Sequence, residues 1–258
     1  ARTTYPYGVA ALSALLLAVV PTVVLTSRLA LAESLIVPLL LVALLAVQIY
    51  ADADSRRPVL WLALACLCAF FAPSAKVPGL VVAVSAALLL ALHHRFREGL
   101  VVGLAGTAGL APYLAYGFVS APSLFRSVIA DQSGRATGLE TLFRLVTSNA
   151  IVSVQWNDSW IVFFWIALGY ATLRRNRLVT ASALPYIAVL VAAVDQSNLR
   201  GWYREPIYPA LCLAGGILLH DTLVRPDAVR ASLLVFGVVF AKLAEVWDVW
   251  MQLGRVLG

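Results

Sequence analysis

Long apolar segments alternate with short polar joints along most of the chain. Three of these segments, Gly8–Thr26, Glu33–Ala51 and Arg97–Val119, approach the ~20 residues that a helix needs to cross the hydrocarbon of a bilayer. Such segments fold as helices, because no water is present there to satisfy the polar groups of the backbone. Hydropathy predicts about nine crossings, at residues 8–27, 33–51, 58–73, 77–92, 98–119, 157–173, 178–194, 203–220 and 231–250. The pattern therefore predicts an all-α fold, a multi-pass transmembrane helix bundle.

Arginine-rich joints fall at every second gap between these segments. They are Arg56-Arg57, the run from His93 to Arg97, the run from Arg174 to Arg177, and the stretch from Arg225 to Arg230. Because one helix is skipped each time, the joints lie on one face of the bilayer, which the positive-inside rule makes cytoplasmic. We therefore expect a multi-pass protein of the cell membrane. Its outer face receives four connections: Ser27–Ala32, the turn at Lys76, residues 120–156, and Asp195–Glu205.

The connection at residues 120–156 is long enough to hold structure of its own. Apolar residues recur in it at helical spacing, and Glu140 and Arg144 form an i,i+4 pair. The apolar positions are Leu139, Leu142, Phe143, Leu145 and Val146. This pattern predicts an amphipathic helix on the outer surface, either a structural cover over the bundle or an element that gates access to a substrate.

Composition supports the membrane interpretation and excludes nucleic acid as a partner. The chain is 62% hydrophobic and 12% charged, with a mean hydropathy of +0.89. The net charge of +6 comes without a basic block outside the joints, so we assign it to topology and to lipid headgroup contact. Neither a repeat nor a low-complexity linker divides residues 1–258, which predicts a single transmembrane domain. The three cysteines lack the spacing of metal ligands.

The chain opens at Ala1 without an initiator methionine, and its only methionine is Met251. We therefore expect it to be the C-terminal, larger part of a longer membrane protein.

Charged residues gather in the turns of the outer face. They are Arg28 and Glu33 around the first turn, Lys76 in the second, and Arg200, Arg204 and Glu205 around Tyr203 in the last. Fixed cations suit a phosphate group, and arginine binds it in bidentate fashion. A neighbouring carboxylate serves as a general base or as a ligand to a divalent metal, and a metal stays an open alternative. The competing interpretation is that each charge snorkels into headgroups or pairs with a neighbour.

Two further charged positions are ambiguous. Lys242 shares a face of the last apolar segment with Glu245 and Asp248, which indicates either an internal ion pair or contact with a substrate. Asp158 stands at the start of the sixth segment, where it either caps the helix or binds a ligand.

Three outer turns together resemble the GT-C glycosyltransferases, in particular the branch of protein O-mannosyltransferases and the aminoarabinose transferase of lipid A. In Thr26–Glu33 a Ser-Arg precedes an acidic residue that opens the next helix. Ala72–Gly79 resembles the family's Lys-x-Pro-Gly turn, and Arg200–Ala210 is similar to its late Arg-Tyr-x-x-Pro-x-x-Pro segment. The order, spacing and sidedness of the three agree over most of the chain.

The resemblance implies transfer of a sugar from a polyprenyl-phosphate donor to a glycan, lipid or protein acceptor on the non-cytoplasmic face. Glu33 would then be the second acidic residue of the active site, and Arg28 would support it. By the same resemblance, Lys76, Arg200 and Arg204 would bind the carrier phosphate. The other residues expected to bind the substrate are Tyr203, Glu205 and Asp158.

One departure from the family is large. Its members carry their main catalytic acidic motif on a first outer loop, which this chain lacks. We expect that loop to belong to a missing N-terminal part, without which the chain is inactive. Two other classes stay open: a transporter or flippase for a lipid or amphiphile, and a non-catalytic membrane subunit.

Overall fold

The computed structural model describes residues 5–20, 23–24, 32–52, 57–133, 160–193 and 205–257. Every regular element in these residues is helical, which confirms the all-α prediction. The helices before the long connection are α1 (Tyr7–Val19), α3 (Ala32–Ala51), α4 (Pro58–Ala75), the 3₁₀ turn η1 (Val77–Gly79), α5 (Leu80–Leu92) and α6 (Phe96–Ser120). Those within it and after it are α7 (Pro122–Ser133), α9 (Ile161–Leu173), α10 (Arg177–Ala193), α11 (Tyr208–Val224) and α12 (Ala228–Leu257).

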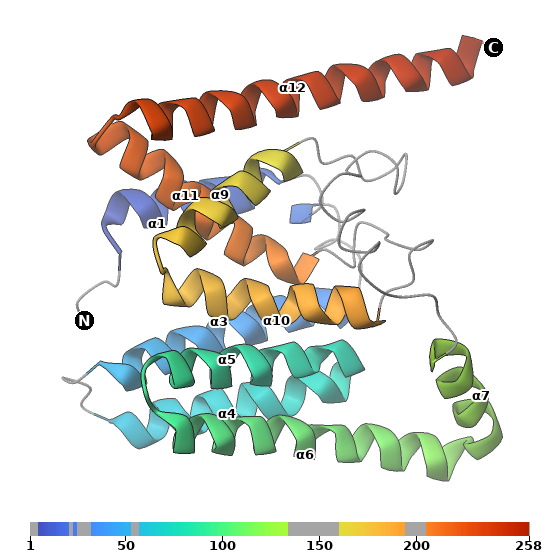
Figure 1. Ribbon diagram of the computed structural model, residues 1–258. Coiled ribbons are helices and arrows are strands. Elements are labelled where there is room, and N and C mark those ends of the chain that lie inside the picture. Colours follow the sequence, from blue (N-terminus) through green and yellow to red (C-terminus); the bar gives the residue numbers. More distant parts are fainter. Residues whose placement is uncertain are drawn as a thin grey trace.

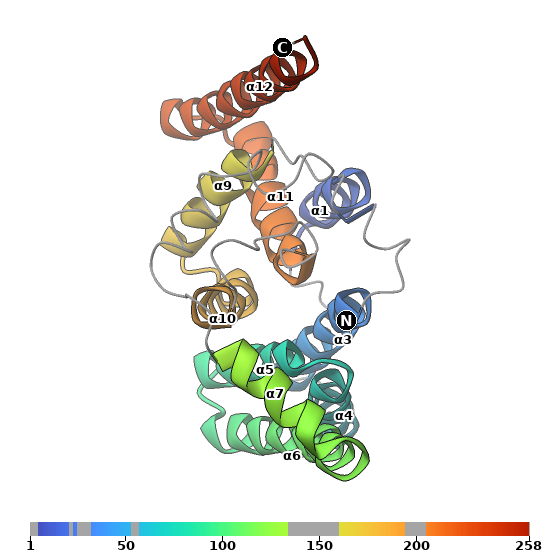
Figure 2. The same ribbon diagram turned by 90° about the vertical axis from the view of Figure 1, so that its right-hand side faces the viewer.

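The helices form two packed groups joined through α10 (Figures 1 and 2). In one group α4 packs against both α3 and α6, and α5 lies against all three. In the other group α11 packs against α1, α9 and α12. Helix α10 contacts α5 of the first group and α9 and α11 of the second.

The two groups are packed with different side chains. Alanines that are almost completely buried line the contacts of the first group, among them Ala43, Ala69 and Ala83. Small residues let helix backbones approach closely, which is how helices associate where water supplies no driving force. Aromatic rings fill the second group: Phe164 lies 5.5 Å from Phe163 and 6.2 Å from Tyr208 between ring centroids.

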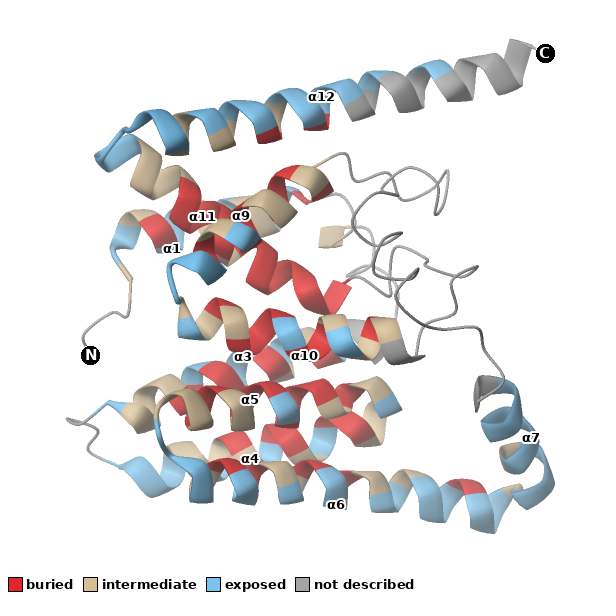
Figure 3. Ribbon diagram, in the orientation of Figure 1, coloured by how far each residue is buried: buried red, intermediate tan, exposed pale blue. Residues whose placement is uncertain are grey.

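Large apolar side chains also cover the outside of the bundle. Leu104 on α6 is 59% exposed and Phe236 on α12 is 58% exposed, and Figure 3 shows exposed residues along the outer sides of both helices. A water-soluble monomer rarely presents apolar surface on this scale. The surface therefore fits lipid as a solvent.

Three helices in the described residues are long and apolar enough to cross a membrane: Pro58–Ala75, Phe96–Ser120 and Glu205–Val224. They are compatible with a membrane protein, but the expected nine crossings are not supported. Helices α1, α5, α9 and α10 have fewer than 18 residues each. Helix α12 is long, but Arg230, Lys242, Glu245 and Asp248 interrupt its apolar sequence.

The arginine-rich joints gather at one end of the bundle. The C-terminal ends of α3, α5, α9 and α11 and the N-terminal ends of α4, α6, α10 and α12 all lie there, at the left of Figure 1. We call this the arginine end. We call the opposite end, where α4 meets η1, the Lys76 end.

Candidate functional site

Lys76 occupies a tight turn between α4 and α5. Its backbone is extended and its N–H lies 3.4 Å from the carbonyl oxygen of Ala72, while the Gly79 N–H donates to the Lys76 carbonyl over 2.7 Å. A Cβ atom at Gly79 would overlap the Ala72 carbonyl, so the turn requires glycine there. The Lys76 side chain is half-buried. The predicted turn is confirmed, and it holds the lysine backbone in a defined position.

The end of α4 is also tied to α6. Ser74 donates a hydrogen bond of 2.8 Å from its Oγ to the carbonyl oxygen of Gly109. A short hydrogen bond between neighbouring helices, two residues before Lys76, limits the movement of the turn relative to α6.

Glu205 lies at the start of the 3₁₀ turn that leads into α11, and it is only 3% exposed. Its neighbours Ile207 and Tyr208 are fully buried. An acidic side chain just ahead of a helix N-terminus is stabilised by the unpaired N–H groups and the dipole of that helix. Acidic side chains are rarely buried, and those that are buried often belong to functional sites. Glu205 is therefore a candidate for binding or catalysis.

The elements that carry three predicted site residues begin or end at the Lys76 end of the bundle. They are the N-terminal turn of α3, which contains Glu33, the α4–η1 turn with Lys76, and the start of α11 next to Glu205 (Figure 1). The side chain of Glu33 lies outside the described part of the chain, as do residues Arg28, Asp158, Arg200, Tyr203 and Arg204. The α4–η1 turn belongs to the first helix group and α11 to the second.

The sequence predicted roles for Asp158 and Lys242. Helix α9 begins at Ile161 with Trp160 as its N-cap, and Asp158, which was expected to cap this helix, lies outside the described residues. Lys242 on α12 is exposed and lies over the ring of Trp160, with its Nζ 5.6 Å from the ring centroid. This contact is a cation–π interaction that links α12 to the start of α9. The side chain of Glu245, its expected partner, is not described.

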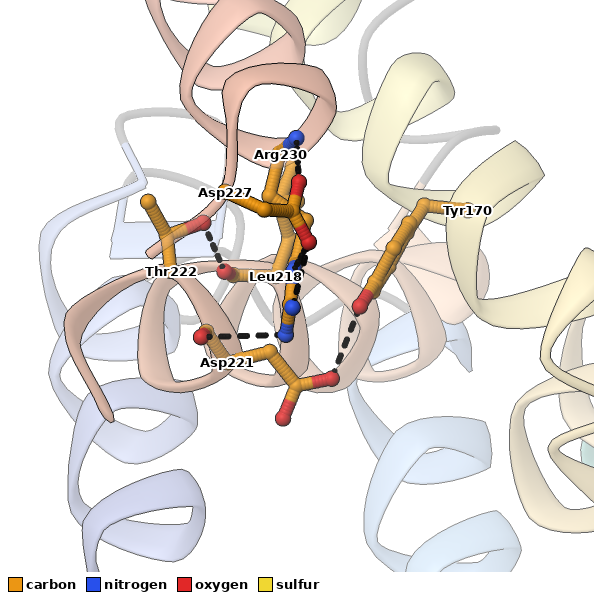
Figure 4. Close-up of polar contacts among 6 residues, drawn as sticks. All are labelled: Tyr170, Leu218, Asp221, Thr222, Asp227 and Arg230. Carbon is orange, nitrogen blue, oxygen red and sulfur yellow. Dashed lines mark hydrogen bonds and ion pairs between the residues drawn. The ribbon is translucent and has the colours of Figure 1, made fainter. Parts of the chain in front are cut away.

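The arginine end holds a polar network that the sequence did not single out (Figure 4). Tyr170 on α9 donates a hydrogen bond of 2.8 Å to Oδ2 of Asp221 on α11. Arg230 on α12 donates to the backbone carbonyl of Asp221 over 3.3 Å and forms an ion pair with Asp227. In the sequence, only the spacing of Asp227 and Arg230, three residues apart, could have predicted part of this network. The other contacts join residues that are farther apart in the chain.

A second cluster at this end joins α3 to α6. Tyr50 donates a hydrogen bond of 2.9 Å to Glu98, which also lies 3.6 Å from the Arg95 guanidinium. The Arg95 guanidinium carbon lies 5.7 Å from the centre of the Tyr50 ring. One carboxylate is thus shared between a phenol and an arginine across two helices.

A third cluster ties the N-terminus to the α9–α10 joint. Tyr5 donates a hydrogen bond of 2.8 Å to Oδ1 of Asn176, and the same oxygen caps α10 by accepting the N–H of Val179 at 3.0 Å. Burial lowers the pKa of His93 in the adjacent joint, and the charges of Arg177 and His94 lower it further. The His93 imidazole is therefore neutral at pH 7.

These contacts divide the roles of the two ends. Glu98 and Asp221 at the arginine end join helices, and in the described residues no cluster of three or more His, Cys, Asp or Glu side chains could hold a metal ion. At the Lys76 end, Lys76 stands on a fixed turn, which suits binding of an anionic group, and Glu205 is a buried carboxylate. Comparisons with known protein families, curated proteins and solved structures find no match for this chain.

Proposed function

We propose that this chain is a membrane-embedded domain of a GT-C-type glycosyltransferase. In this proposal it sits in the cell membrane with its arginine end in the cytoplasm. It transfers a sugar from a polyprenyl-phosphate donor to an acceptor at the outer face. One observation supports the proposal most: the elements carrying the motif residues Glu33, Lys76 and Glu205 begin or end at the same end of the bundle, and the arginine-rich joints occupy the other.

The proposed chemistry needs two kinds of side chain. In the transfer, a carboxylate such as Glu33 takes the proton from an acceptor hydroxyl, whose oxygen bonds to the anomeric carbon of the sugar. The bond from that carbon to the phosphate oxygen breaks, and the polyprenyl phosphate leaves with the electron pair. Cations stabilise the charge that develops on the leaving phosphate, a role that we give to Lys76, Arg200 and Arg204.

The supports of Lys76 favour this assignment. A lysine carried on a freely moving loop would lose much of its binding energy in becoming ordered, whereas a fixed one loses less. Lys76 follows a helix that is hydrogen-bonded to α6 through Ser74, and its turn is closed by Gly79. The backbone that carries Lys76 is thereby held in place before a substrate arrives.

The test is sugar transfer by the full-length protein in nanodiscs, with a radiolabelled polyprenyl-phosphate sugar as donor. We expect Glu33→Gln and Lys76→Ala each to lower turnover tenfold or more, a loss of about 1.4 kcal/mol of transition-state stabilisation. Lys76→Arg should recover part of the activity, because it keeps the charge. The matched control is Arg97→Ala, an exposed cation at the arginine end, which should retain activity.

Unchanged turnover in both variants would overturn the site assignment. Movement of the labelled lipid across vesicles without cleavage of its phosphate–sugar bond would overturn the enzyme assignment and favour a transporter.

A further inference from the structure

Helix α7 runs across the Lys76 end of the bundle, whereas α4, α5 and α6 run along its length (Figures 1 and 2). It follows directly on α6, with only Ala121 between them. The sequence pattern predicted the amphipathic outer helix at Leu139–Val146, which lies outside the described residues. The helix at Pro122–Ser133 was not predicted.

The length of α6 determines how far beyond the end of α4 helix α7 lies. Helix α6 has 25 residues and α4 has 18, which at 1.5 Å per residue makes them roughly 37 Å and 27 Å long. Both begin at the arginine end (Figure 1). Helix α6 therefore extends about 10 Å beyond α4, past a hydrocarbon core of about 30 Å and into the headgroup region.

One face of α7 is apolar and the other is polar. At 100° per residue, Leu124, Phe125, Val128 and Ile129 share one side, and Ser123, Arg126 and Ser127 lie on the opposite side. Asp131, in the last turn, lies at the edge of the apolar side next to Leu124. The apolar side chains are strongly exposed: Leu124 is 63% exposed, and Val128 and Ile129 are each 43% exposed. The described residues therefore leave most of this face uncovered.

Phe125 is the exception and fixes the helix to α6. Its ring packs edge-on against Phe118 and Tyr113 of α6, at centroid distances of 5.0 and 5.6 Å. It also lies directly over Gly117, where a Cβ atom would come within 2.5 Å of the ring. This contact holds α7 against the end of α6 and leaves the rest of the apolar face open.

The exposed apolar face of α7 is continuous with an exposed apolar surface on α6. No charged residue occurs from Gly99 to Phe125. Near the end of α6, Tyr116 is 74% exposed and Val119 is 82% exposed. The first charged residue of α7, Arg126, is exposed and stands on the polar side, where it can reach a lipid phosphate.

We propose that α7 is an interfacial helix bound to the membrane surface at the Lys76 end. Its Leu124, Val128 and Ile129 side chains enter the boundary between acyl chains and headgroups, and Ser123 and Ser127 face water. The occupant of the apolar face is lipid. The inference depends on the orientation of α6 in the bilayer and not on the proposed sugar transfer.

Depth-dependent quenching of a fluorophore tests this proposal. The full chain, with Cys66, Cys68 and Cys212 replaced by alanine, receives one cysteine at position 124 or 128, or at 123 or 127 as the matched polar-face controls. Each variant is labelled with an environment-sensitive dye in nanodiscs that contain lipids carrying a nitroxide near the headgroup. We expect the probes at 124 and 128 to be quenched by the lipid nitroxide at least about threefold more than those at 123 and 127, and aqueous iodide to quench in the reverse order.

A probe at Leu104, in the middle of α6, calibrates the method, because a nitroxide deep in the acyl chain should quench it best. Equal iodide quenching at all four positions of α7 would overturn the proposal by placing the helix in water. Blue-shifted emission at 124 and 128 without quenching by lipid would overturn it in another way, by showing that protein covers the face.

Discussion

At the scale of single residues, Asp227 and Arg230 anchor the turn between α11 and α12. Asp227 accepts hydrogen bonds from the Arg230 backbone N–H at 2.8 Å and from its guanidinium. Arg230 also reaches back to the carbonyl of Asp221, whose carboxylate is held by Tyr170. The corner is thus fixed by contacts that run from α9 through α11 to α12 (Figure 4).

This arrangement predicts a pH dependence at Asp227. Hydrogen bonds from the Arg230 side chain and backbone hold the pKa of this carboxyl below its usual value. A depressed pKa means that the ionised form stabilises the fold above the pKa of the unfolded chain, ~3.9, and that this stabilisation is lost as the pH falls through the lower folded value. Asp227→Asn should therefore lower the unfolding temperature of the protein in detergent from pH 7 down to about pH 5, and by less below about pH 4.

Thermal unfolding of the wild type and the variant, measured side by side across this range, checks the prediction. A difference between the two proteins that stays constant down to pH 2 would contradict it. The carboxylate would then act through packing and not through its charge.

At the scale of elements, the positions of the helices were largely predictable. The expected segments 33–51, 58–73 and 77–92 coincide within two residues with α3, with α4, and with η1 and α5 together. These boundaries are set by chemistry that is local in sequence: apolar runs end at Arg57, at the Pro-Gly turn, and at His93. Hydropathy records such boundaries directly.

The number of crossings and the place of the outer helix were not predictable in the same way. A hydropathy average gives 13 apolar residues with a neighbouring polar turn nearly the same score as a full membrane-spanning helix. Short helices such as α5 and α9 were therefore counted as full crossings. The expected crossing 98–119 coincides with α6, but the residues of α7 directly after it were assigned to the connection at 120–156. The amphipathic period of α7 becomes visible only when the change of direction at Ala121 is known.

The contact between α4 and α6 gives a prediction with an internal control. A Cβ atom at Gly109 would overlap the Phe70 carbonyl, whereas one at Gly103 on the same helix has nothing within 4 Å. Overpacking of this kind typically costs 1–3 kcal/mol, and removing an unneeded helical glycine is worth up to about 1 kcal/mol in the other direction. We therefore expect Gly109→Ala to destabilise the protein by roughly 2 kcal/mol and Gly103→Ala to be neutral or stabilising.

The free energy of unfolding in mixed micelles, obtained from denaturant titrations, separates the two substitutions. Equal effects of the same sign would mean that α4 and α6 do not approach each other at Gly109. The hydrogen bond from Ser74 to the Gly109 carbonyl should weaken in parallel with the loss of stability.

At the scale of the whole molecule, the sequence predicted that the arginine-rich joints lie together, but it did not predict a converged site. The end of the bundle at which each joint lies follows from the number of helices between the joints. Figure 1 shows these joints at one end, as expected. A site requires side chains from different helices to converge. Lys76 and Glu205 stand on elements of two separate helix groups, and pairing between such groups leaves no periodic trace in the chain.

The arrangement of the ends leads to a prediction about topology in the cell. Positive joints are retained on the cytoplasmic side during insertion, so the arginine end should be cytoplasmic and α7 should be outside. In a chain whose three native cysteines are replaced by alanine, single cysteines at Arg174 and Pro226 report on the arginine end, and Ser123 reports on α7. All three positions are exposed in the structure.

A membrane-impermeant maleimide should label the Ser123→Cys variant in intact cells and the other two only after the membrane is opened. Arg174 and Pro226 lie in joints that one helix pair, α10 and α11, separates along the chain. Their agreement would therefore show that an even number of crossings separates the two joints, as expected if this pair crosses the membrane twice. Labelling of Pro226→Cys without Arg174→Cys in intact cells would mean that an odd number of crossings separates the joints. In that case the two ends of the bundle in Figure 1 would not correspond to the two faces of the membrane. The proposed location of Lys76 and Glu205 at a common outer face would then be wrong as well.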